Sequence, residues 1–509
     1  MTRAEAVERL ARDRFDLCVV GGGIVGAGTA ALAAQHGLRV ALVERDDFAS
    51  GTSSASSKLV HGGLRYLRMG DFRLVREALL EARALARTVA PHLVRPLRFL
   101  LPVYDGGPYG PAAIRAGLVL YDVLAGAPRV RQVLVAPERA AKLVPPLRTG
   151  GLRAAGVYHD AQVDDARLCL ANVRAAADAG AVVVPRAEAV AIERAAGTVA
   201  VTVRDRAAGG VATVLARAVV NASGAAVDDV RRLEDARAGT SVAVSKGVHL
   251  VLDAPGAWEA ALTIPVDRTR VSFAIPWDGL LLLGTTDSAF SLGRDPLEPT
   301  PREEAQVLAE AGRVLPPETL RPERIRFRFA GLRVLPLTDR PTAEARREVA
   351  LTRGPLGVLS VAGGKLTTYR RIARAALREL APELALHRLD AGAPLPGAAD
   401  PAEVAATLVR DRPELEPGLA DHLAGIYGSL AGEVLASCED RRDALEPLAS
   451  GTRDVVAQAV YARTHEWALE PEDVARRRTH LAFHGLDTPA LRRRVAELWD
   501  EVPAGVDAA

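Results

Sequence analysis

The sequence predicts an α/β protein with a parallel nucleotide-binding sheet, a second domain built on an antiparallel sheet, and a C-terminal helical domain. Three observations lead to this fold class. A G-x-G-x-x-G motif follows an apolar run near the N-terminus. Strand-like runs occupy much of residues 241–290. Residues 390–403 form a linker rich in Pro, Gly, Ala and Asp, and helical patterns follow it to residue 500.

The opening segment has the pattern of a Rossmann-like unit. Residues 15–20 read as a buried parallel strand, and an alanine-rich helix follows the glycines. Gly21 allows the tight turn, Gly23 lets the backbone approach a pyrophosphate, and Gly26 lets the helix pack closely on the strand. The helix N-terminus then offers N–H groups and a partial positive charge to the phosphates. The segment therefore predicts a bound dinucleotide.

The next residues indicate which dinucleotide is bound. A second strand at residues 40–43 ends at Glu44, whose carboxylate can accept both ribose hydroxyls and disfavours a 2′-phosphate. An NAD domain would usually continue with another strand and helix. Here residues 51–66 are rich in Ser and Gly, with Lys58, His61 and Arg65 closely spaced. Small residues let the backbone lie against a flat ring, which favours FAD.

Hydrophobic periodicity predicts the remaining elements in order. Helices are expected at residues 1–14, 72–88, 112–125, 164–179, 301–314 and 363–380. Strands are expected at residues 97–104, 182–184, 241–252, 270–275, 280–284, 349–352 and 358–361. Alternation through residues 187–204 and 211–220 predicts a β-meander, and residues 326–336 are expected to return toward the cofactor. Helix 112–125 combines apolar and basic residues, so it suits either the core of the second domain or a bilayer interface.

Composition limits the classes of function. The net charge of +2 gives no global field for nucleic acid. Three scattered cysteines indicate a reducing compartment, and no cluster predicts a metal site. Neither a signal peptide nor a membrane-spanning stretch is expected, which points to the cytoplasm. Only four of the 65 basic residues are lysine, at positions 58, 142, 246 and 365, and three of these lie in the motifs described next.

Five motifs resemble the FAD-dependent glycerol-3-phosphate dehydrogenases of the aerobic bacterial type. They are S-S-A-S-S-K-L-V-H-G-G-L-R-Y-L at 53–67, V-D-D-A-R-L at 163–168, K-G-V-H at 246–249, G-T-T-D at 284–287 and G-G-K-L-T-T-Y-R at 363–370. The likeness extends from about residue 16 to about residue 482. Residues 223–226 depart from it, because S-G-A-A stands where the family usually has T-G-P-W.

The resemblance implies a fold of the glutathione-reductase and D-amino-acid-oxidase type. The FAD-binding domain is expected to be discontinuous, with residues 12–90, 150–230 and 330–390. The substrate domain is expected at 91–149 and 231–329, and the helical domain at 400–509. The expected FAD-binding residues are Gly21, Gly23, Gly26, Glu44, Arg45, Thr52, Ser53, Ser57, Lys58, Gly62, Gly63, Leu64, Ala189, Ser223, Gly224, Gly364, Lys365, Leu366 and Thr367.

The implied reaction takes a hydride from C2 of sn-glycerol 3-phosphate to N5 of the flavin and yields dihydroxyacetone phosphate. Arginine is a natural bidentate partner for phosphate, which makes Arg65, Arg333 and Arg353 the expected clamp. Valine follows Arg333 where the family has proline.

The catalytic assignments rest on the same motifs. His249 is the expected base for the C2 hydroxyl, with His61 as the alternative. Lys365 and the helix start beside it are expected to stabilise the anionic reduced flavin. Asp287 is expected either to orient His249 or to bond the substrate.

The expected electron acceptor is a quinone, reached by peripheral contact with the cytoplasmic face of the membrane, and a homodimer is a further candidate assembly. Three alternatives stay open. A glycerol-3-phosphate oxidase would use oxygen instead. An amine or amino-acid oxidase would place one arginine opposite a carboxylate and line its site with aromatics, of which this chain has 4%. A flavin-binding sensor would lack turnover.

Overall fold

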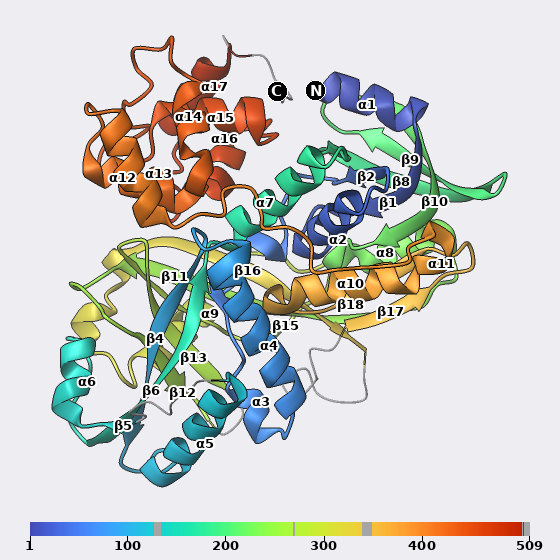
Figure 1. Ribbon diagram of the computed structural model, residues 1–509. Helices are drawn as coiled ribbons and strands as arrows, with labels where there is room; N and C mark the ends of the chain where they lie inside the picture. Colours follow the sequence, from blue (N-terminus) through green and yellow to red (C-terminus); the bar gives the residue numbers. More distant parts are fainter. Residues whose placement is uncertain (127–133, 268–269, 338–348, 501, 503–509) are drawn as a thin grey trace.

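The computed structural model describes residues 1–126, 134–267, 270–337, 349–500 and 502, without the side chains of Arg65 and Arg68. Figure 1 shows two sheets that lie one above the other and a helical domain, coloured orange to red, that packs beside both. This arrangement confirms the predicted fold class.

The first sheet has eight strands. Its main path is β17 (Val349–Arg353), β18 (Leu359–Gly363), β10 (Val211–Asn221), β1 (Arg14–Val20), β2 (Val40–Val43) and β7 (Val182–Val184). β1 pairs in parallel with β2 and β10, and β10 in parallel with β18. β8 (Ala187–Ala195) and β9 (Thr198–Asp205) extend β10 as the predicted antiparallel meander.

Helices cover this sheet because their small residues allow close contact. α2 (Ile24–Gln35) packs against α7 (Asp165–Asp178) and α10 (Tyr369–Glu379). A Cβ on Gly26 would lie 1.9 Å from the carbonyl oxygen of Gly21, and a Cβ on Gly28 would lie 2.6 Å from the Tyr369 ring. Neither position has room for a side chain. The same sheet also carries α1 (Arg3–Arg12), α8 (Val227–Glu234) and α11 (Ala381–Leu384).

The second sheet has ten strands. Its main path is β15 (Ser288–Ala289), β11 (Val242–Asp253), β14 (Leu280–Gly284), β13 (Val271–Trp277), β12 (Ala261–Pro265), β4 (Val94–Tyr104), β6 (Leu152–Val163) and β3 (Leu59–Val60). β16 (Ile325–Pro336) joins at β11, and β5 (Leu134–Val135) joins at β6. All of these pairings are antiparallel except β12 with β4.

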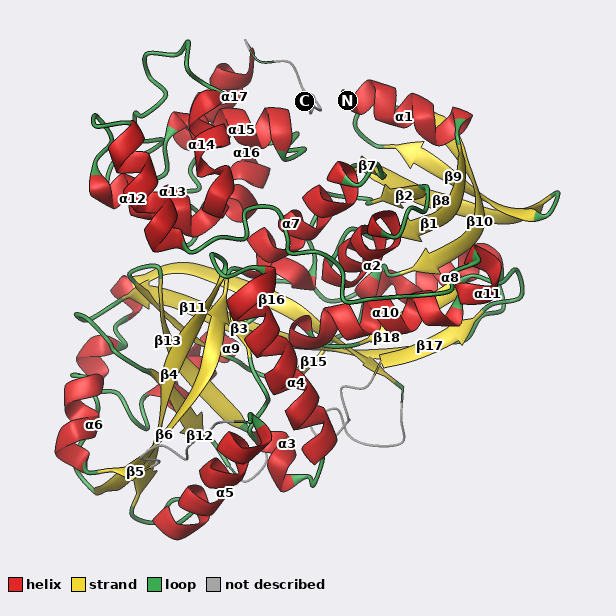
Figure 2. Ribbon diagram, viewed as in Figure 1, coloured by secondary structure: helices red, strands yellow, loops and turns green. Residues whose placement is uncertain are grey.

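Helices flank the second sheet (Figure 2). They are α3 (Arg65–Arg68), α4 (Phe72–Ala84) with a π-helical turn at Leu85–Val89, α5 (Pro111–Leu124), α6 (Pro137–Leu143) and α9 (Pro301–Ala311). On α5 the side chain of Tyr121 is buried, whereas that of Val123 is 59% exposed. Within the described ranges, no helix has the length and apolarity needed to cross a membrane.

The C-terminal domain has a hydrophobic core of its own. It contains α12 (Pro401–Asp411), α13 (Pro417–Tyr427), α14 (Ala431–Ala436), α15 (Val456–His465), α16 (Pro471–Asp473) and α17 (Pro489–Asp500).

Three expected domain assignments differ from the observed sheets. Residues 12–90, expected in the FAD-binding domain, include β3, which pairs with β6 in the ten-stranded sheet. The boundary at residue 150 assigns β6 to the FAD-binding domain, yet β6 pairs with β4 in the ten-stranded sheet. The boundary at residue 330 cuts β16, which pairs along its length with β11. The pattern of residues 152–163 did not predict a strand, because it contains Ala-Ala-Gly and lacks a run of β-branched residues.

Candidate active site

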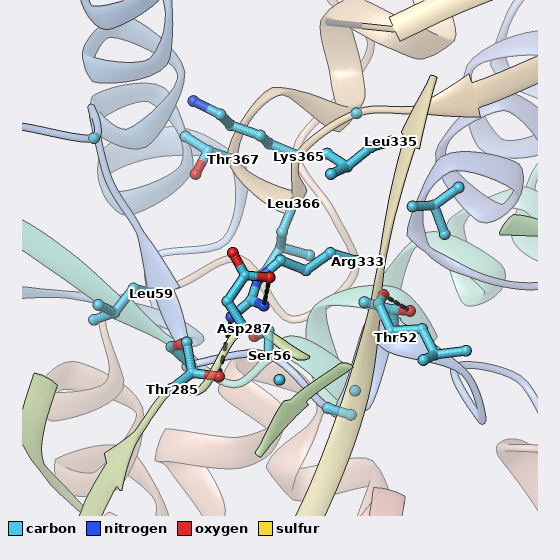
Figure 3. A pocket seen from close by; sticks show the side chains of 18 of the residues that line it. Thr52, Ser56, Leu59, Thr285, Asp287, Arg333, Leu335, Lys365, Leu366 and Thr367 are labelled. Atoms are coloured by element: carbon cyan, nitrogen blue, oxygen red, sulfur yellow. Dashed lines mark hydrogen bonds and ion pairs between the residues drawn. The ribbon is translucent and has the colours of Figure 1, made fainter. Parts of the chain in front are cut away.

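A cavity of about 1450 Å³ lies where the carboxyl ends of β1, β10 and β18 face the ten-stranded sheet. Most ligand pockets have volumes of roughly 300–1,000 Å³, so this cavity has room for a dinucleotide and a small substrate together. Figure 3 shows the part near Arg333 and Lys365. Parallel sheets commonly bind nucleotides at this edge.

Most of the predicted cofactor residues line this cavity: Gly21, Gly23, Glu44, Arg45, Thr52, Ser53, Ser57, Gly63, Leu64, Ser223, Gly224, Gly364, Lys365, Leu366 and Thr367. The described lining does not include Gly26, Lys58, Gly62 or Ala189. Gly26 acts in helix packing, and Ala189 lies on β8.

The glycine-rich turn forms a cradle for a diphosphate. Gly21 has a φ of +110°, and a Cβ there would lie 2.6 Å from the carbonyl oxygen of Ala222. Gly23 caps the N-terminus of α2. The Ser53 hydroxyl accepts a hydrogen bond of 2.9 Å from the Ile24 N–H. A helix N-terminus suits an anionic ligand because its backbone dipoles place partial positive charge there.

Glu44 lies at the end of β2 and faces the same cavity. Its carboxylate accepts hydrogen bonds from the N–H groups of Gly22, at 2.6 Å, and Asp46, at 2.8 Å. Burial raises the pKa of Glu44 above its usual value, although these two N–H groups oppose the shift. The acid therefore fastens the strand end to the glycine turn.

Residues 51–53 and 55–57, which line the part of the cavity expected to hold the flavin ring, make close backbone contacts with β16. The Thr52 hydroxyl donates to the carbonyl of Leu332 at 2.7 Å. A Cβ on Gly331 would lie 2.3 Å from the carbonyl oxygen of Ala55. The loop before α3 approaches from the other side, with Gly63 at a φ of +78°. These residues allow a flat ring to lie against backbone.

Lys58 is fully buried away from the cavity. Its ammonium group forms an ion pair with Asp165, the first residue of α7, and donates to the Ser54 carbonyl at 3.0 Å. Lys246 likewise pairs with Glu303 at 2.9 Å. Among the three motif lysines, Lys365 faces the cavity, with its Nζ 3.7 Å from the centroid of the Tyr66 ring. The structure therefore gives Lys58 a structural contact in place of the expected cofactor contact.

His249 lines the cavity from β11. Its Nε2 lies 2.8 Å from the Ser57 hydroxyl, and its ring stacks on Phe329 with centroids 4.8 Å apart. Burial, together with the positive charges of Arg333 and Lys58, lowers the pKa of His249 to about 3. The imidazole is therefore neutral near pH 7, and the same lowered pKa makes it a weaker base.

Arg333 and Asp287 both lie on the wall of the cavity and contact each other, as Figure 3 shows. The guanidinium contacts Asp287 at 3.2 Å, the Thr285 hydroxyl at 3.0 Å and the Thr286 carbonyl at 2.8 Å. Among the described contacts, Asp287 thus pairs with Arg333, whereas the hydrogen-bond partner of His249 is Ser57.

Arg353 and Arg65 are the other two arginines of the expected phosphate clamp. Arg353, the last residue of β17, pairs with Glu379 on α10 and Glu383 on α11, and the described lining residues do not include it. The side chain of Arg65 lies outside the described part of the chain. Arg270, which no motif indicated, lines the cavity and pairs with Glu310 at 2.9 Å.

Asp160 is a further group that the motifs did not reveal. It lies on β6 and accepts hydrogen bonds from the Tyr121 hydroxyl, at 2.7 Å, and from the Gly62 N–H, at 3.2 Å. Burial raises the pKa of Asp160 to about 7. This partly buried carboxyl thus fixes the loop that carries His61 and Gly63.

Comparisons with known proteins agree with this geometry. Residues 16–370 match the family described as FAD dependent oxidoreductase, and residues 391–502 match the C-terminal domain of alpha-glycerophosphate oxidase. A glycerol-3-phosphate dehydrogenase of Mycobacterium leprae is 38% identical over 94% of this chain and 83% of its own length. An aerobic glycerol-3-phosphate dehydrogenase of Staphylococcus haemolyticus is 31% identical over 96% of this chain and 90% of its own.

A solved structure is also similar along almost the whole chain. The glycerol-3-phosphate dehydrogenase from Bacillus halodurans, complexed with FAD, superposes with a TM-score of 0.79 at 27% identity. The match covers 98% of this chain and 93% of that structure.

Proposed function

The chain belongs to the family of FAD-dependent glycerol-3-phosphate dehydrogenases, and we propose that it oxidises sn-glycerol 3-phosphate at C2 and passes the electrons to a quinone. The observation that supports this best is a neutral imidazole and two cationic side chains around one cavity. His249, Arg333 and Lys365 all line it, beside the glycine cradle.

FAD is the cofactor, and the residues present fit it. The cradle at Gly21 and Gly23 suits the diphosphate, Glu44 suits the ribose, and the backbone near Gly63 and Gly364 suits the ring system. When bound, FAD supplies a two-electron acceptor for the hydride from C2. Lys365 and the short helix that follows it place positive charge at the ring end of the cavity.

The chain's own residues bind and orient the substrate. In this proposal Arg333 binds the phosphate, because a guanidinium fork matches phosphate oxygens. Asp287 and Thr285 hold that fork in place. His249 accepts the proton of the C2 hydroxyl, and Ser57 fixes the plane of its ring. Arg353 is not part of the proposed phosphate clamp, because it lies outside the described cavity lining and pairs with Glu379 and Glu383.

An apolar rim supports a quinone as the acceptor. Five large apolar residues both line the cavity and have exposed fractions between 38% and 47%, namely Met69, Phe72, Leu120, Leu292 and Leu297. Such a rim suits a lipid-soluble acceptor and a position against the cytoplasmic face of a membrane. The match to the alpha-glycerophosphate oxidase domain favours oxygen as the second candidate acceptor.

The test is anaerobic mixing of the purified holoenzyme with sn-glycerol 3-phosphate while the flavin absorption band is followed. Rapid bleaching by this substrate, and not by glycine or a D-amino acid, supports the proposed chemistry. Oxygen or a soluble quinone is then added to the reduced enzyme. Faster reoxidation by the quinone supports the proposed acceptor, whereas rapid formation of hydrogen peroxide contradicts it.

A further inference from the structure

The segment between β2 and the turn at Thr52–Ser54 contacts both the cavity and the C-terminal domain. Its two ends, residues 44–46 and 50–53, line the cavity. Its middle residues, Asp47, Phe48 and Ala49, have exposed fractions of 1%, 0% and 1%, and the described lining excludes them. The middle of this segment is therefore buried outside the cavity lining, whereas its two ends face the cavity.

Asp47 is bound by two arginines of the C-terminal domain. Arg478 has no exposed surface and grips both carboxylate oxygens, one of them at 2.8 Å. Arg477 contacts the same carboxylate through its Nε. Arg478 also donates to the Glu466 carbonyl at 2.6 Å, which ties the ion pair to the residue after α15. Paired guanidinium groups in a buried setting make this a geometrically specific contact.

Phe48 continues the same interface toward the glycine turn. Its ring meets Trp467 of the C-terminal domain edge to face, with centroids 5.8 Å apart. On the other side the ring packs on Gly22, where a Cβ would lie 2.4 Å from it. The Ala49 N–H donates to the Gly22 carbonyl at 3.1 Å. Gly22 lies between the two glycines of the diphosphate cradle.

A third contact holds the adjoining turn before β8. Asp473 of the C-terminal domain binds Arg186 at 3.1 Å, and the Arg186 N–H donates to the Asp46 carbonyl at 2.9 Å. Asp473 also pairs with Arg477. The contacts thus form one network from the C-terminal domain to the strand end that carries Glu44.

We propose that the C-terminal helical domain is part of the FAD-binding apparatus, and that Arg477 and Arg478 are positioning residues that hold segment 44–53 against the cofactor through Asp47. The domain contributes no described residue to the cavity lining, so it acts on FAD through this segment. Binding free energies are reciprocal, so bound FAD should also hold the C-terminal domain more tightly in place.

The test compares two C-terminal variants that each break a buried ion pair with the FAD-binding part. Arg478→Gln breaks the pair with Asp47. Glu466→Gln is the matched control, because Glu466 pairs with Arg167 on α7, at 2.5 Å, and α7 supplies no described lining residue. The rate of FAD release from the diluted holoenzyme is followed by the fluorescence of free flavin, and thermal melting of each holoenzyme is recorded in parallel.

We expect FAD to leave Arg478→Gln at least about 10-fold faster than the wild type, because this variant releases the segment whose two ends line the cavity. Glu466→Gln also loses a buried charged pair, but it should stay within about 3-fold because its partner lies on α7, away from the cavity lining. Arg478→Lys should restore part of the retention, since lysine keeps the charge but not the fork. Equal release rates in Arg478→Gln and Glu466→Gln would overturn the proposal. If Arg478→Gln fails to fold, Arg477→Gln, which leaves Arg478 in place, decides in the same assay.

A second readout uses the reciprocal effect. Limited proteolysis at the 390–400 linker should be slower with FAD bound than after FAD is stripped, and Arg478→Gln should reduce that difference. Unchanged protection in Arg478→Gln contradicts the proposal. Both readouts are independent of turnover, so a wrong substrate or acceptor would leave them unaffected.

Discussion

Asp160 should make the stability of this protein depend on pH in a calculable way. Burial raises its pKa from 3.8 to about 7. The folded state therefore binds the proton more tightly than the unfolded state, so the stabilisation is complete below pH 3.8 and is lost as the pH rises through about 7. At pH 5 the carboxyl is about two pH units below its folded pKa, which corresponds to about 2.7 kcal/mol; at pH 8 the contribution is close to zero.

The matching variant is Asp160→Asn, which keeps an acceptor for the Tyr121 hydroxyl and the Gly62 N–H but cannot ionise. Chains unfold with an entropy of about 2.1 cal/mol/K per residue, so for 509 residues 2.7 kcal/mol shifts Tm by about 2.5 °C. We expect the Tm of the wild type, relative to that of Asp160→Asn, to fall by about this amount between pH 5 and pH 8.

The assay is thermal unfolding of both holoenzymes in one buffer series from pH 5 to pH 8. Asp105→Asn serves as the control, because Asp105 is a carboxyl 72% exposed just beyond β4 in the same sheet. Its Tm should run parallel to that of the wild type. Parallel curves for the wild type and Asp160→Asn would refute the argument, because they would show that Asp160 makes no pH-dependent contribution to stability between pH 5 and pH 8.

Three further predictions concern the cavity. His249→Ala should slow flavin reduction by about 10²–10⁴-fold with FAD still bound, and a near wild-type rate in anaerobic stopped flow would remove His249 as the base. Because its pKa is about 3, the wild-type kcat/KM should show no loss attributable to imidazole protonation as pH falls from 8 to 6, and such a loss would contradict the neutral base. Arg333→Ala should raise KM at least 10-fold in steady-state assays, whereas Arg353→Ala, whose partners are Glu379 and Glu383, should stay within about 2-fold; equal effects would reject the clamp.

The nucleotide-binding unit at the start of the chain was predictable because residues close together in the sequence determine its structure. The strand, the glycine turn, α2 and Glu44 follow each other within one unit, and each glycine has its own steric reason. Strand β6 was missed because tertiary pairing with β4 determines it, not its own residue pattern. Asp160 lies on that strand, so its hydrogen bond with the Gly62 N–H was not predicted either.

Motif membership placed residues near the site without saying what each one touches. Lys58 and Asp165 belong to two different motifs, and the structure shows that they pair with each other. Arg353 follows a predicted strand, but its partner Glu383 lies 30 residues later, on α11. Such pairings depend on the three-dimensional arrangement, which a single sequence does not specify. The roles proposed for His249 and Arg333 remain predictions for the experiments above.

The distribution of lysine gives this protein an unusual chemical handle. Lys58 and Lys246 are buried in ion pairs, and Lys365 is half-buried in the cavity, whereas Lys142 is exposed on α6. A mild amine-reactive ester should therefore modify the surface mainly at Lys142 and at the chain's α-amino group. A dye or electrode tether could thus be attached away from the cavity, and any slower labelling of Lys365 would report on whether substrate shields it.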